Sequence, residues 1–137
     1  MIETIFKHNR IIIIGYPKSG KTTLFKTLSS YDESKAYYLL QTDDYIGKHS
    51  YKQTLYEIIE DLKGKRKYIV EGIQGYRLLR KISELNLLDM KPDLIINCIT
   101  DRPIQQKHLK QIKGLNTIWN QYLSIERDLP KIIESRN

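Results

Sequence analysis

The residues of this chain most able to do chemistry stand together near its amino end. Residues 15–22 read Gly-Tyr-Pro-Lys-Ser-Gly-Lys-Thr and fit the pattern G-x-x-x-x-G-K-[ST] of a phosphate-binding loop. In such a loop successive backbone N–H groups turn toward phosphate oxygens, a lysine reaches the β and γ phosphates, and a hydroxyl ligates Mg²⁺. Lys21 and Thr22 supply these side chains, so the sequence predicts a nucleoside triphosphate with Mg²⁺ as ligands.

The elements around the pattern are those that such a loop requires. The β-branched run Ile11–Ile14 precedes it, and Leu24, Phe25 and Leu28 give the following residues, Lys21–Ser29, the apolar stripe of a helix. The alternative is a glycine-rich turn without a ligand, which would require all of these features to coincide by chance. We expect the nucleotide to contact Gly15, Pro17, Lys18, Ser19, Gly20, Lys21, Thr22 and Thr23.

The rest of the chain alternates strand-like and helical patterns, which is typical of an α/β fold with a short parallel sheet flanked by crossover helices. We expect about four strands, at Ile11–Ile14, Tyr37–Leu40, Tyr68–Val70 and Leu94–Ile99. Between the second and third strands, we expect a helix that is capped by Ser50 and ended by Gly64, and the next helix carries Leu78 to Leu85. Two more helices are predicted, over residues 103–114 and 115–130, and the 137 residues are interpreted as one domain.

Carboxylates follow three of these strands, at the sheet edge where open parallel sheets bind ligands. We interpret Asp43 as the base that accepts a proton from an acceptor hydroxyl, on a strand expected beside the phosphate loop. Asp44 could turn toward the opposite side or toward the metal. Glu71, after three apolar residues, could hold Mg²⁺ directly or through water, or could contact the acceptor. Alternatively Asp43 and Asp44 only cap a turn, Glu71 is a surface carboxylate, and Asp101 is the N-cap of the helix that begins at Pro103.

Three segments together resemble phosphate-loop kinases of the nucleoside and nucleoside-monophosphate type, with uridine kinase the most similar pattern. They are Gly15–Thr22, the stretch Thr42-Asp43-Asp44-Tyr45, and the stretch Ile69-Val70-Glu71-Gly72-Ile73. The stretch Ile118-Trp119-Asn120-Gln121-Tyr122 and Pro130 also resemble the end of uridine kinases. The resemblance implies a single P-loop NTPase domain, puts Asp43 on the family's catalytic aspartate, and puts Glu71 on its glutamate.

The segment after the fourth strand departs from that family, whose lid carries several arginines. Here Arg102 is the one arginine of residues 102–113, and Lys107, Lys110 and Lys113 are the other basic residues apart from His108. Lysine provides a point charge without the bidentate fork of arginine. We nevertheless expect Arg102, with Lys21 and Asp43, to act on the transferred phosphoryl group, and the lid lysines to screen its charge. Four strand-like runs also leave the chain without the family's final strand.

Composition places further bounds on function. No apolar run approaches the length of a membrane span, no secretory signal is visible at the start, and Cys98 is the only cysteine, which favours a cytoplasmic protein with a buried thiol. His8, His49 and His108 are isolated, which argues against a zinc site. The net charge of +7 favours polyanionic partners. The short run Lys63, Lys65, Arg66 and Lys67 is interpreted as a solvated turn rather than a nucleic-acid contact.

Three functional hypotheses remain open. The first is an ATP-dependent kinase that phosphorylates a nucleoside, a nucleotide or a similar small molecule, in a pocket that Tyr45 and Tyr76 could line. The second is a nucleotide-binding regulatory module with little turnover. The third is a nucleic-acid 5′-end kinase, which the net charge favours and whose Asp-Asp-Tyr-Arg pattern Asp43-Asp44-Tyr45 resembles, although Ile46 replaces the arginine. The sequence does not indicate an oligomeric state.

Overall fold

One five-stranded sheet, with all strands parallel, organises the chain in the computed structural model, which describes residues 2–45, 47 and 50–136. The strand order is β2-β3-β1-β4-β5. The strands are β1 (Arg10–Gly15), β2 (Tyr38–Gln41), β3 (Tyr68–Glu71), β4 (Leu94–Ile99) and β5 (Lys131–Arg136). The carboxyl ends of all five strands therefore meet at one edge of the sheet, which we call the carboxyl edge.

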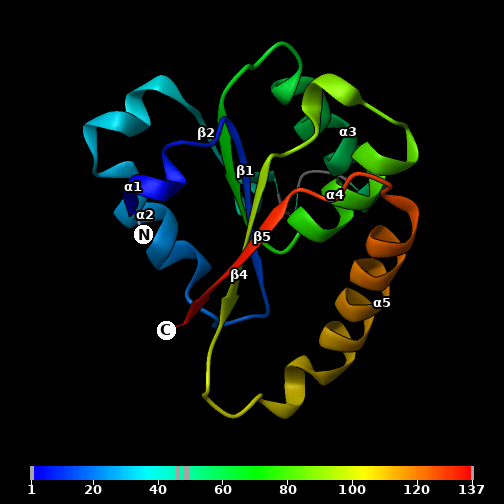
Figure 1. Ribbon diagram of the computed structural model, residues 1–137. Helices are drawn as coiled ribbons and strands as arrows, with labels where there is room; N and C mark the ends of the chain where they lie inside the picture. Colours follow the sequence, from blue (N-terminus) through cyan, green and yellow to red (C-terminus); the bar gives the residue numbers. More distant parts are fainter. Residues whose placement is uncertain (1, 46, 48–49, 137) are drawn as a thin grey trace.

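Helices cover both faces of the sheet (Figure 1). On one face lie α1 (Ile2–Ile5) and α2 (Lys21–Ser29), and on the other lie α3 (Tyr51–Leu62), α4 (Gly75–Glu84) and α5 (Leu109–Ile125). Short 3-10 turns join the elements: η1 (Asp32–Ala36), η2 (Thr42–Tyr45), η3 (Leu88–Met90) and η4 (Gln106–His108). The three-layer arrangement confirms the predicted α/β class.

The cover on both faces explains the apolar run of the first strand. Ile12 and Ile14 join the core beneath α3, α4 and α5, whereas Ile11 and Ile13 join the core beneath α1 and α2. All four side chains are fully buried. A strand buried on both faces needs a continuous apolar sequence rather than an alternating one.

The predicted boundaries of several elements are confirmed. The fourth strand and the helix Lys21–Ser29 agree at both ends. Ser50 caps α3, because its hydroxyl accepts a hydrogen bond from the Gln53 backbone N–H (3.3 Å), and Gly64, at φ 79°, follows the end of that helix.

Three predictions are wrong. The sheet has a fifth strand, β5, which pairs with β4 from Leu94↔Lys131 to Ile99↔Arg136 and fills the place of the final strand thought to be missing. The two helices predicted over residues 103–130 are one helix, α5, which continues through Gly114. The second strand does not lie beside the loop-bearing strand, because β3 lies between β2 and β1.

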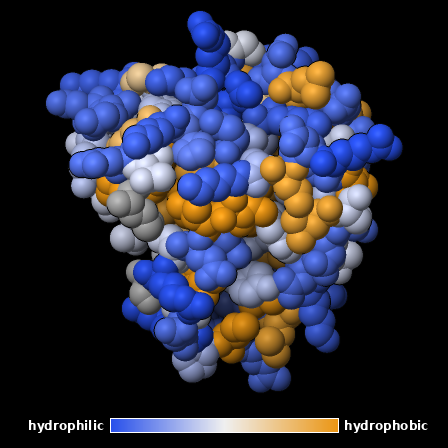
Figure 2. Space-filling view, viewed as in Figure 1, coloured by the Kyte–Doolittle hydropathy of each residue, from blue (hydrophilic) through white to orange (hydrophobic). Residues whose placement is uncertain are grey.

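The face that carries β5 is mainly hydrophilic, with apolar side chains exposed between the polar ones (Figure 2). Ile132 of β5 is among the exposed apolar residues. Within the described part of the chain, no helix combines the length and the apolar character needed to cross a bilayer.

Candidate functional site

The segment Gly15–Thr22, which we call the glycine-rich loop, connects β1 to α2 at the carboxyl edge. Lys18 and Gly20 adopt left-handed backbone conformations, with φ 67° and 94°. The chain turns sharply there, and α2 begins at Lys21 behind the N-cap Gly20, with no side-chain cap. The first turn of a helix carries N–H groups without intrahelical acceptors, so this end can attract an anion.

The hydroxyl of Ser19 adds a second unsatisfied group to the loop. Ser19 is 2% exposed, and among the described residues its Oγ has no hydrogen-bond partner. A buried hydroxyl without a partner costs free energy that an incoming acceptor could recover. Gly15 allows the loop to lie close to β4, because a Cβ there would stand 2.8 Å from the carbonyl oxygen of Cys98.

Lys21 places a desolvated positive charge beneath the loop. The side chain is 7% exposed, and its Nζ donates a hydrogen bond to the carbonyl oxygen of Tyr16 (2.8 Å). Burial lowers the pKa of Lys21 below its ordinary value, although the negative charges of Glu71 and Asp43 act in the opposite direction. A partly compensated cation in this position would gain from a phosphate group.

Glu71 lies next to the start of α2 because β3 pairs directly with β1. Its carboxylate is 2% exposed, and Oε1 accepts hydrogen bonds from Thr22 Oγ1 (3.0 Å) and from Gln41 Nε2 (3.1 Å). Gln41 is the register partner of Glu71 on β2. Three neighbouring elements thus converge on one carboxylate oxygen.

A Mg²⁺ ion fits the chemistry of this group. Hard oxygen ligands with one or two protein carboxylates, completed by phosphate oxygens and water, are what Mg²⁺ prefers. Thr22 and Glu71 provide a hydroxyl and a carboxylate side by side. Across residues 2–45, 47 and 50–136, there is no cluster of three or more His, Cys, Asp or Glu side chains suited to a metal, so the nucleotide would have to supply the other ligands.

The two aspartates after β2 differ in their surroundings. Both lie on η2 and are exposed, but the charge of Asp43 acts on Lys21, whereas that of Asp44 acts on Tyr45. The charge of Asp43 therefore acts on the lysine of the glycine-rich loop, although β3 lies between β2 and β1. No hydrogen bond joins Asp44 to the Thr22 and Glu71 pair within the described residues.

Close packing holds η2 against the end of β3. Thr42 is fully buried, its Oγ1 has no partner among the described residues, and a Cβ on Gly72 would overlap with that oxygen. Gly72 has φ 140°, a backbone conformation that L side chains rarely adopt. The glycine after Glu71 thus allows η2 and Asp43 to approach the loop.

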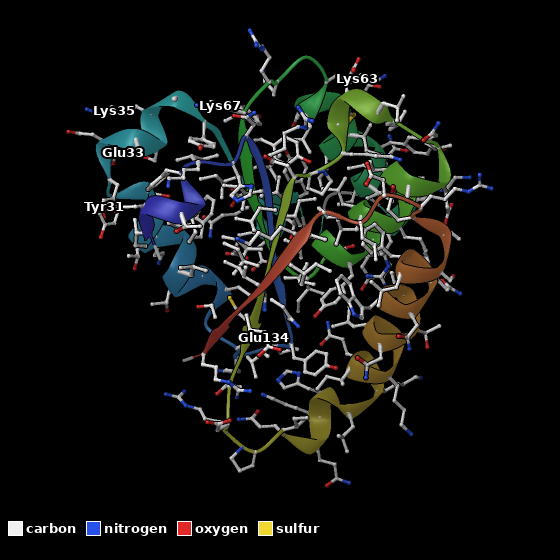
Figure 3. The ribbon with its side chains drawn as sticks, in the orientation of Figure 1. Tyr31, Glu33, Lys35, Lys63, Lys67 and Glu134 are labelled. Carbon is white, nitrogen blue, oxygen red and sulfur yellow. The ribbon has the colours of Figure 1, made fainter. Side chains whose placement is uncertain are left out.

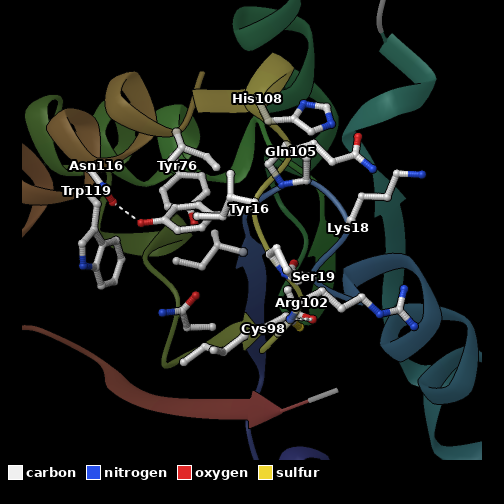
Figure 4. A pocket seen from close by; sticks show the side chains of 18 residues that line it. Tyr16, Lys18, Ser19, Tyr76, Cys98, Arg102, Gln105, His108, Asn116 and Trp119 are labelled. Atoms are coloured by element: carbon white, nitrogen blue, oxygen red, sulfur yellow. Dashed lines mark hydrogen bonds between the residues drawn. The ribbon is translucent and has the colours of Figure 1, made fainter. Parts of the chain in front are cut away.

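A pocket of about 530 Å³ opens beside the glycine-rich loop, between the end of β4 and α5 (Figure 4). Its walls are aromatic and aliphatic, with amide side chains among them. The walls include Tyr16, Tyr76, Trp119, Ile112, Asn97 and Asn116. Tyr16 crosses from the loop to α5, where its hydroxyl donates a hydrogen bond to Asn116 Oδ1.

Only some of the predicted site residues line this pocket. Pro17, Lys18, Ser19 and Arg102 line the pocket, and the side chains of Lys18 and Arg102 extend toward the same side in Figure 4. Asp43, Asp44, Lys21, Thr22 and Glu71 do not line it. Tyr76 is a wall as expected, but Tyr45 instead donates a hydrogen bond to Asp61.

The structure also shows the surroundings of Asp101, Cys98 and two of the histidines. Asp101 does not cap a helix, since α5 begins at Leu109, and its carboxylate instead accepts a hydrogen bond from Arg136 (3.3 Å). Cys98 is buried as predicted, and burial raises the pKa of its thiol to about 11. His8 lies 3.4 Å from Asp93, whereas the Nε2 of His108 is buried without a partner among the described residues. His49 and Ile46 lie outside the described residues.

Sequence reasoning missed the pocket walls contributed by α5 and the role of Gln41. Gln41 directly precedes Thr42-Asp43 at the end of a strand, which is the signal that could have identified it. Asn116 and Trp119 carried no comparable local signal, because only the packing of α5 brings them to the loop.

Known proteins do not assign the chain to a family: no protein-family model matches it, and no curated protein is significantly similar to it.

Proposed function

We propose that the chain is an ATP-dependent kinase that transfers the γ-phosphoryl group to a hydroxyl of an acceptor seated beside the glycine-rich loop. The observation that carries the proposal is a set of groups at one point with donor capacity to spare: the uncapped start of α2, the buried Ser19 hydroxyl, and the desolvated Lys21 ammonium, which makes one hydrogen bond, to Tyr16. All three would be satisfied by phosphate oxygens.

In this proposal each residue of the site has a defined task. The amides of the glycine-rich loop and Lys21 bind the β and γ phosphates, and Thr22 with Glu71 would hold Mg²⁺, which neutralises charge on those phosphates. The acceptor oxygen forms a bond to the γ phosphorus while the bond from that phosphorus to the β–γ bridging oxygen breaks. ADP leaves, and the hydroxyl proton passes to the carboxylate of Asp43.

The pocket is suited to an acceptor with a planar ring. Three aromatic side chains form its walls, and amides of Asn97 and Asn116 can hydrogen-bond to ring substituents. Lys18 and Arg102 stand at the loop side of the pocket, where positive charge would stabilise the phosphoryl group in transfer. A nucleoside, a nucleotide and the terminal nucleotide of a strand all have the required ring and hydroxyl.

Transfer from labelled ATP to a panel of acceptors tests the proposal, with Asp43→Asn as the central variant. We expect Asp43→Asn to lower kcat by about 100-fold or more and to leave the Kd for ATP unchanged, since a general base acts on the transfer step. Asp32→Asn is the matched control, because Asp32 is exposed on η1 and pairs with Lys35. Transfer at the wild-type rate by Asp43→Asn would remove the assigned base.

A second candidate is a nucleotide-binding module with negligible turnover. The observation in its favour is that Asp43 does not line the pocket, so the base and the acceptor space are separate in this conformation. Tight binding of ATP without phosphoryl transfer to any acceptor, including water, would establish this alternative over the kinase.

A further inference from the structure

The segment from Arg102 to Ile125 carries positive charge, and the carboxylates that flank it, Asp101 and Glu126, pair with Arg136 and Lys91 outside it. It contains no aspartate or glutamate. Its four Lys and Arg residues, which we call the basic strip, are all exposed: Arg102, Lys107, Lys110 and Lys113. Arg102 makes one hydrogen bond, from its backbone N–H to Thr100 (3.2 Å), and no described residue forms an ion pair with any of the four side chains.

The other basic run of the chain is different, because much of its charge is used locally. Lys63 pairs with Glu60 (2.6 Å), Lys65 stands 4.8 Å from the centre of the Tyr38 ring, and Lys67 stands 5.1 Å from that of Tyr37. That run precedes β3 and lies at the amino edge of the sheet, at the opposite end of the molecule from the β4–α5 connection (Figure 3). Among the described residues, the lack of ion pairs and ring contacts therefore distinguishes the basic strip from Lys63, Lys65 and Lys67.

The basic strip begins at the rim of the pocket and continues along α5. Arg102 and His108 line the pocket, and Ile112 and Asn116 of α5 line it as well. Lys110 and Lys113 are three residues apart in α5, so they occupy adjacent turns of one face. A ligand held in the pocket could extend directly onto these lysines.

The pocket itself selects among polyanions. Among the described residues no carboxylate lines it, whereas Lys18 and Arg102 do, together with three aromatic rings. Inorganic polyphosphate and anionic lipid headgroups would satisfy the charges but have no planar ring to stack on Tyr76 or Trp119. Single-stranded nucleic acid has both a charged backbone and bases that stack on aromatic side chains.

We infer that single-stranded nucleic acid binds along the basic strip with its terminal nucleotide in the pocket. This inference rests on the proposed kinase function, because it names the acceptor of that site as the terminal sugar hydroxyl of a strand. That hydroxyl takes the acceptor's part in the transfer described above, with its proton passing to Asp43 and ADP leaving.

Fluorescence of the single tryptophan gives a direct assay, since Trp119 is a wall of the pocket. Wild-type protein is titrated with a short oligothymidylate at several salt concentrations, and stacking of the terminal base should quench Trp119. The test variant is Lys107→Gln/Lys110→Gln/Lys113→Gln. Glutamine has a helix propensity close to that of lysine, so α5 should be retained.

The salt dependence of binding gives the expected magnitude. Each phosphate contact to a single strand contributes about 0.7 to the slope of log K against log salt, so the loss of three contacts should reduce that slope by about 2. The control variant Lys7→Gln/Lys63→Gln/Arg66→Gln removes the same charge near the amino edge of the sheet and should keep the wild-type slope. Both variants have the same net charge, so a difference between them reports position.

Three results would overturn the inference. The first is a strand that binds without quenching Trp119, and the second is an equal salt slope for the two variants. The third is equal binding of anionic phosphatidylserine vesicles, with the same loss in the test variant. Calorimetry with Mg-ATP on the wild-type protein separates this failure from failure of the proposed function: if ATP binds and a free nucleoside is phosphorylated while the strand is not bound, only the strand proposal falls.

Discussion

Replacement of Lys21 by methionine would separate the binding role of this side chain from any role in stability. Methionine retains an apolar stem of similar length and removes the charge. In the folded chain burial lowers the pKa of the ammonium, so folding with Lys21 charged costs free energy. The hydrogen bond to Tyr16 contributes about 1 kcal/mol in the opposite direction. We therefore expect the unfolding free energy to change by less than about 1 kcal/mol, which corresponds to a change in Tm of about 4 °C or less.

The pH dependence of this comparison has a defined sign. Because the folded pKa of Lys21 lies below its ordinary value of 10.5, the cost of burying the ammonium is fully present below the folded pKa. That cost disappears as the pH rises toward 10.5. The stability of Lys21→Met relative to wild type should therefore decrease over that alkaline interval, as measured by urea unfolding at a series of pH values.

Binding of ATP should respond far more strongly than stability. A hydrogen bond from an ammonium to phosphate contributes about 1.5–3 kcal/mol, so Lys21→Met should weaken ATP binding by about 10- to 100-fold in calorimetry. Lys26→Met is the matched control, because Lys26 is exposed on the same helix. Wild-type ATP affinity in Lys21→Met would refute the assignment, and a fall in Tm of about 10 °C or more would show that Lys21 mainly stabilises the fold.

Four further substitutions test the packing around the site. Gly15→Ala should destabilise the fold by about 2 kcal/mol in urea denaturation, since its Cβ would meet the Cys98 carbonyl oxygen at 2.8 Å, and unchanged stability would contradict that close approach. Gly114→Ala should stabilise by about 1 kcal/mol, because nothing lies within 4 Å and the position is inside α5; a loss would argue against a continuous helix. The rate of Cys98 alkylation in the folded protein should rise with pH with a midpoint near 11, and a midpoint near 9 would show an exposed thiol. The stability of the wild-type protein relative to Cys98→Ala should fall between pH 9 and 11. Glu126→Gln should cost about 2 kcal/mol, because it removes the ionic partner of Lys91 and leaves Nζ only its hydrogen bond to Asn86. Burial raises the pKa of Glu126, but hydrogen bonds from Ser83 and Lys91 lower it on balance. The stability difference should therefore vanish in acid below that pKa, and a constant difference would contradict the ionic pairing.

Local sequence was sufficient for elements whose burial or end signals are strong. The continuous apolar run Ile11–Ile14 was enough to predict β1, because a strand covered on both faces needs such a run. Ser50 and Gly64 indicated where α3 begins and ends. The two glycines that were read as helix ends show the limit of such signals. Gly64 has a left-handed backbone and follows the end of α3, whereas Gly114 has no positive φ and lies inside α5. The helix continues through Gly114 because Ile112, Leu115 and Ile118 are buried on either side of it.

The fifth strand was missed because it lies at the edge of the sheet. Residues 131–136 alternate little, and only Ile132 and Ile133 are apolar. Its side chains are mostly exposed, and its strand conformation depends on pairing with β4, whose residues lie about three dozen positions earlier. Such pairing is a tertiary effect that no short window of sequence contains.

The sequence predicted several individual residues of the candidate site, but it did not predict which of them lie in contact. The glycine-rich loop and Glu71 follow from motif and position, but their contact depends on β3 pairing with β1, which the sequence did not indicate. The pocket forms only because α5 packs beside the glycine-rich loop. This packing brings Trp119 to the same pocket as Tyr16, although the two residues are about 100 positions apart in the sequence. Strand order and helix docking, rather than residue type, decide these neighbours.

Unpaired hydroxyls and a desolvated charge gather at the carboxyl edge of the sheet. The hydroxyls of Ser19 and Thr42 have no partners among the described residues, and Lys21 is desolvated. Positive φ angles occur at both edges: at Lys18 and Gly72 here, and at Asn86 between α4 and β4. At the amino edge, by contrast, the buried Tyr68 hydroxyl donates a hydrogen bond to the Met90 carbonyl oxygen (2.6 Å), and the partly exposed Asp93 accepts one from the Arg10 backbone N–H (2.7 Å).

Selection for stability alone would relieve the costs at Ser19, Thr42 and Lys21, because an apolar side chain of similar size removes each of them. Unsatisfied polar groups persist at sites where a ligand uses them. The donors concerned are amides, hydroxyls and an ammonium, which together prefer an anion with several oxygens. The asymmetry between the two edges therefore supports a phosphate ligand at the glycine-rich loop independently of the sequence pattern that first suggested it.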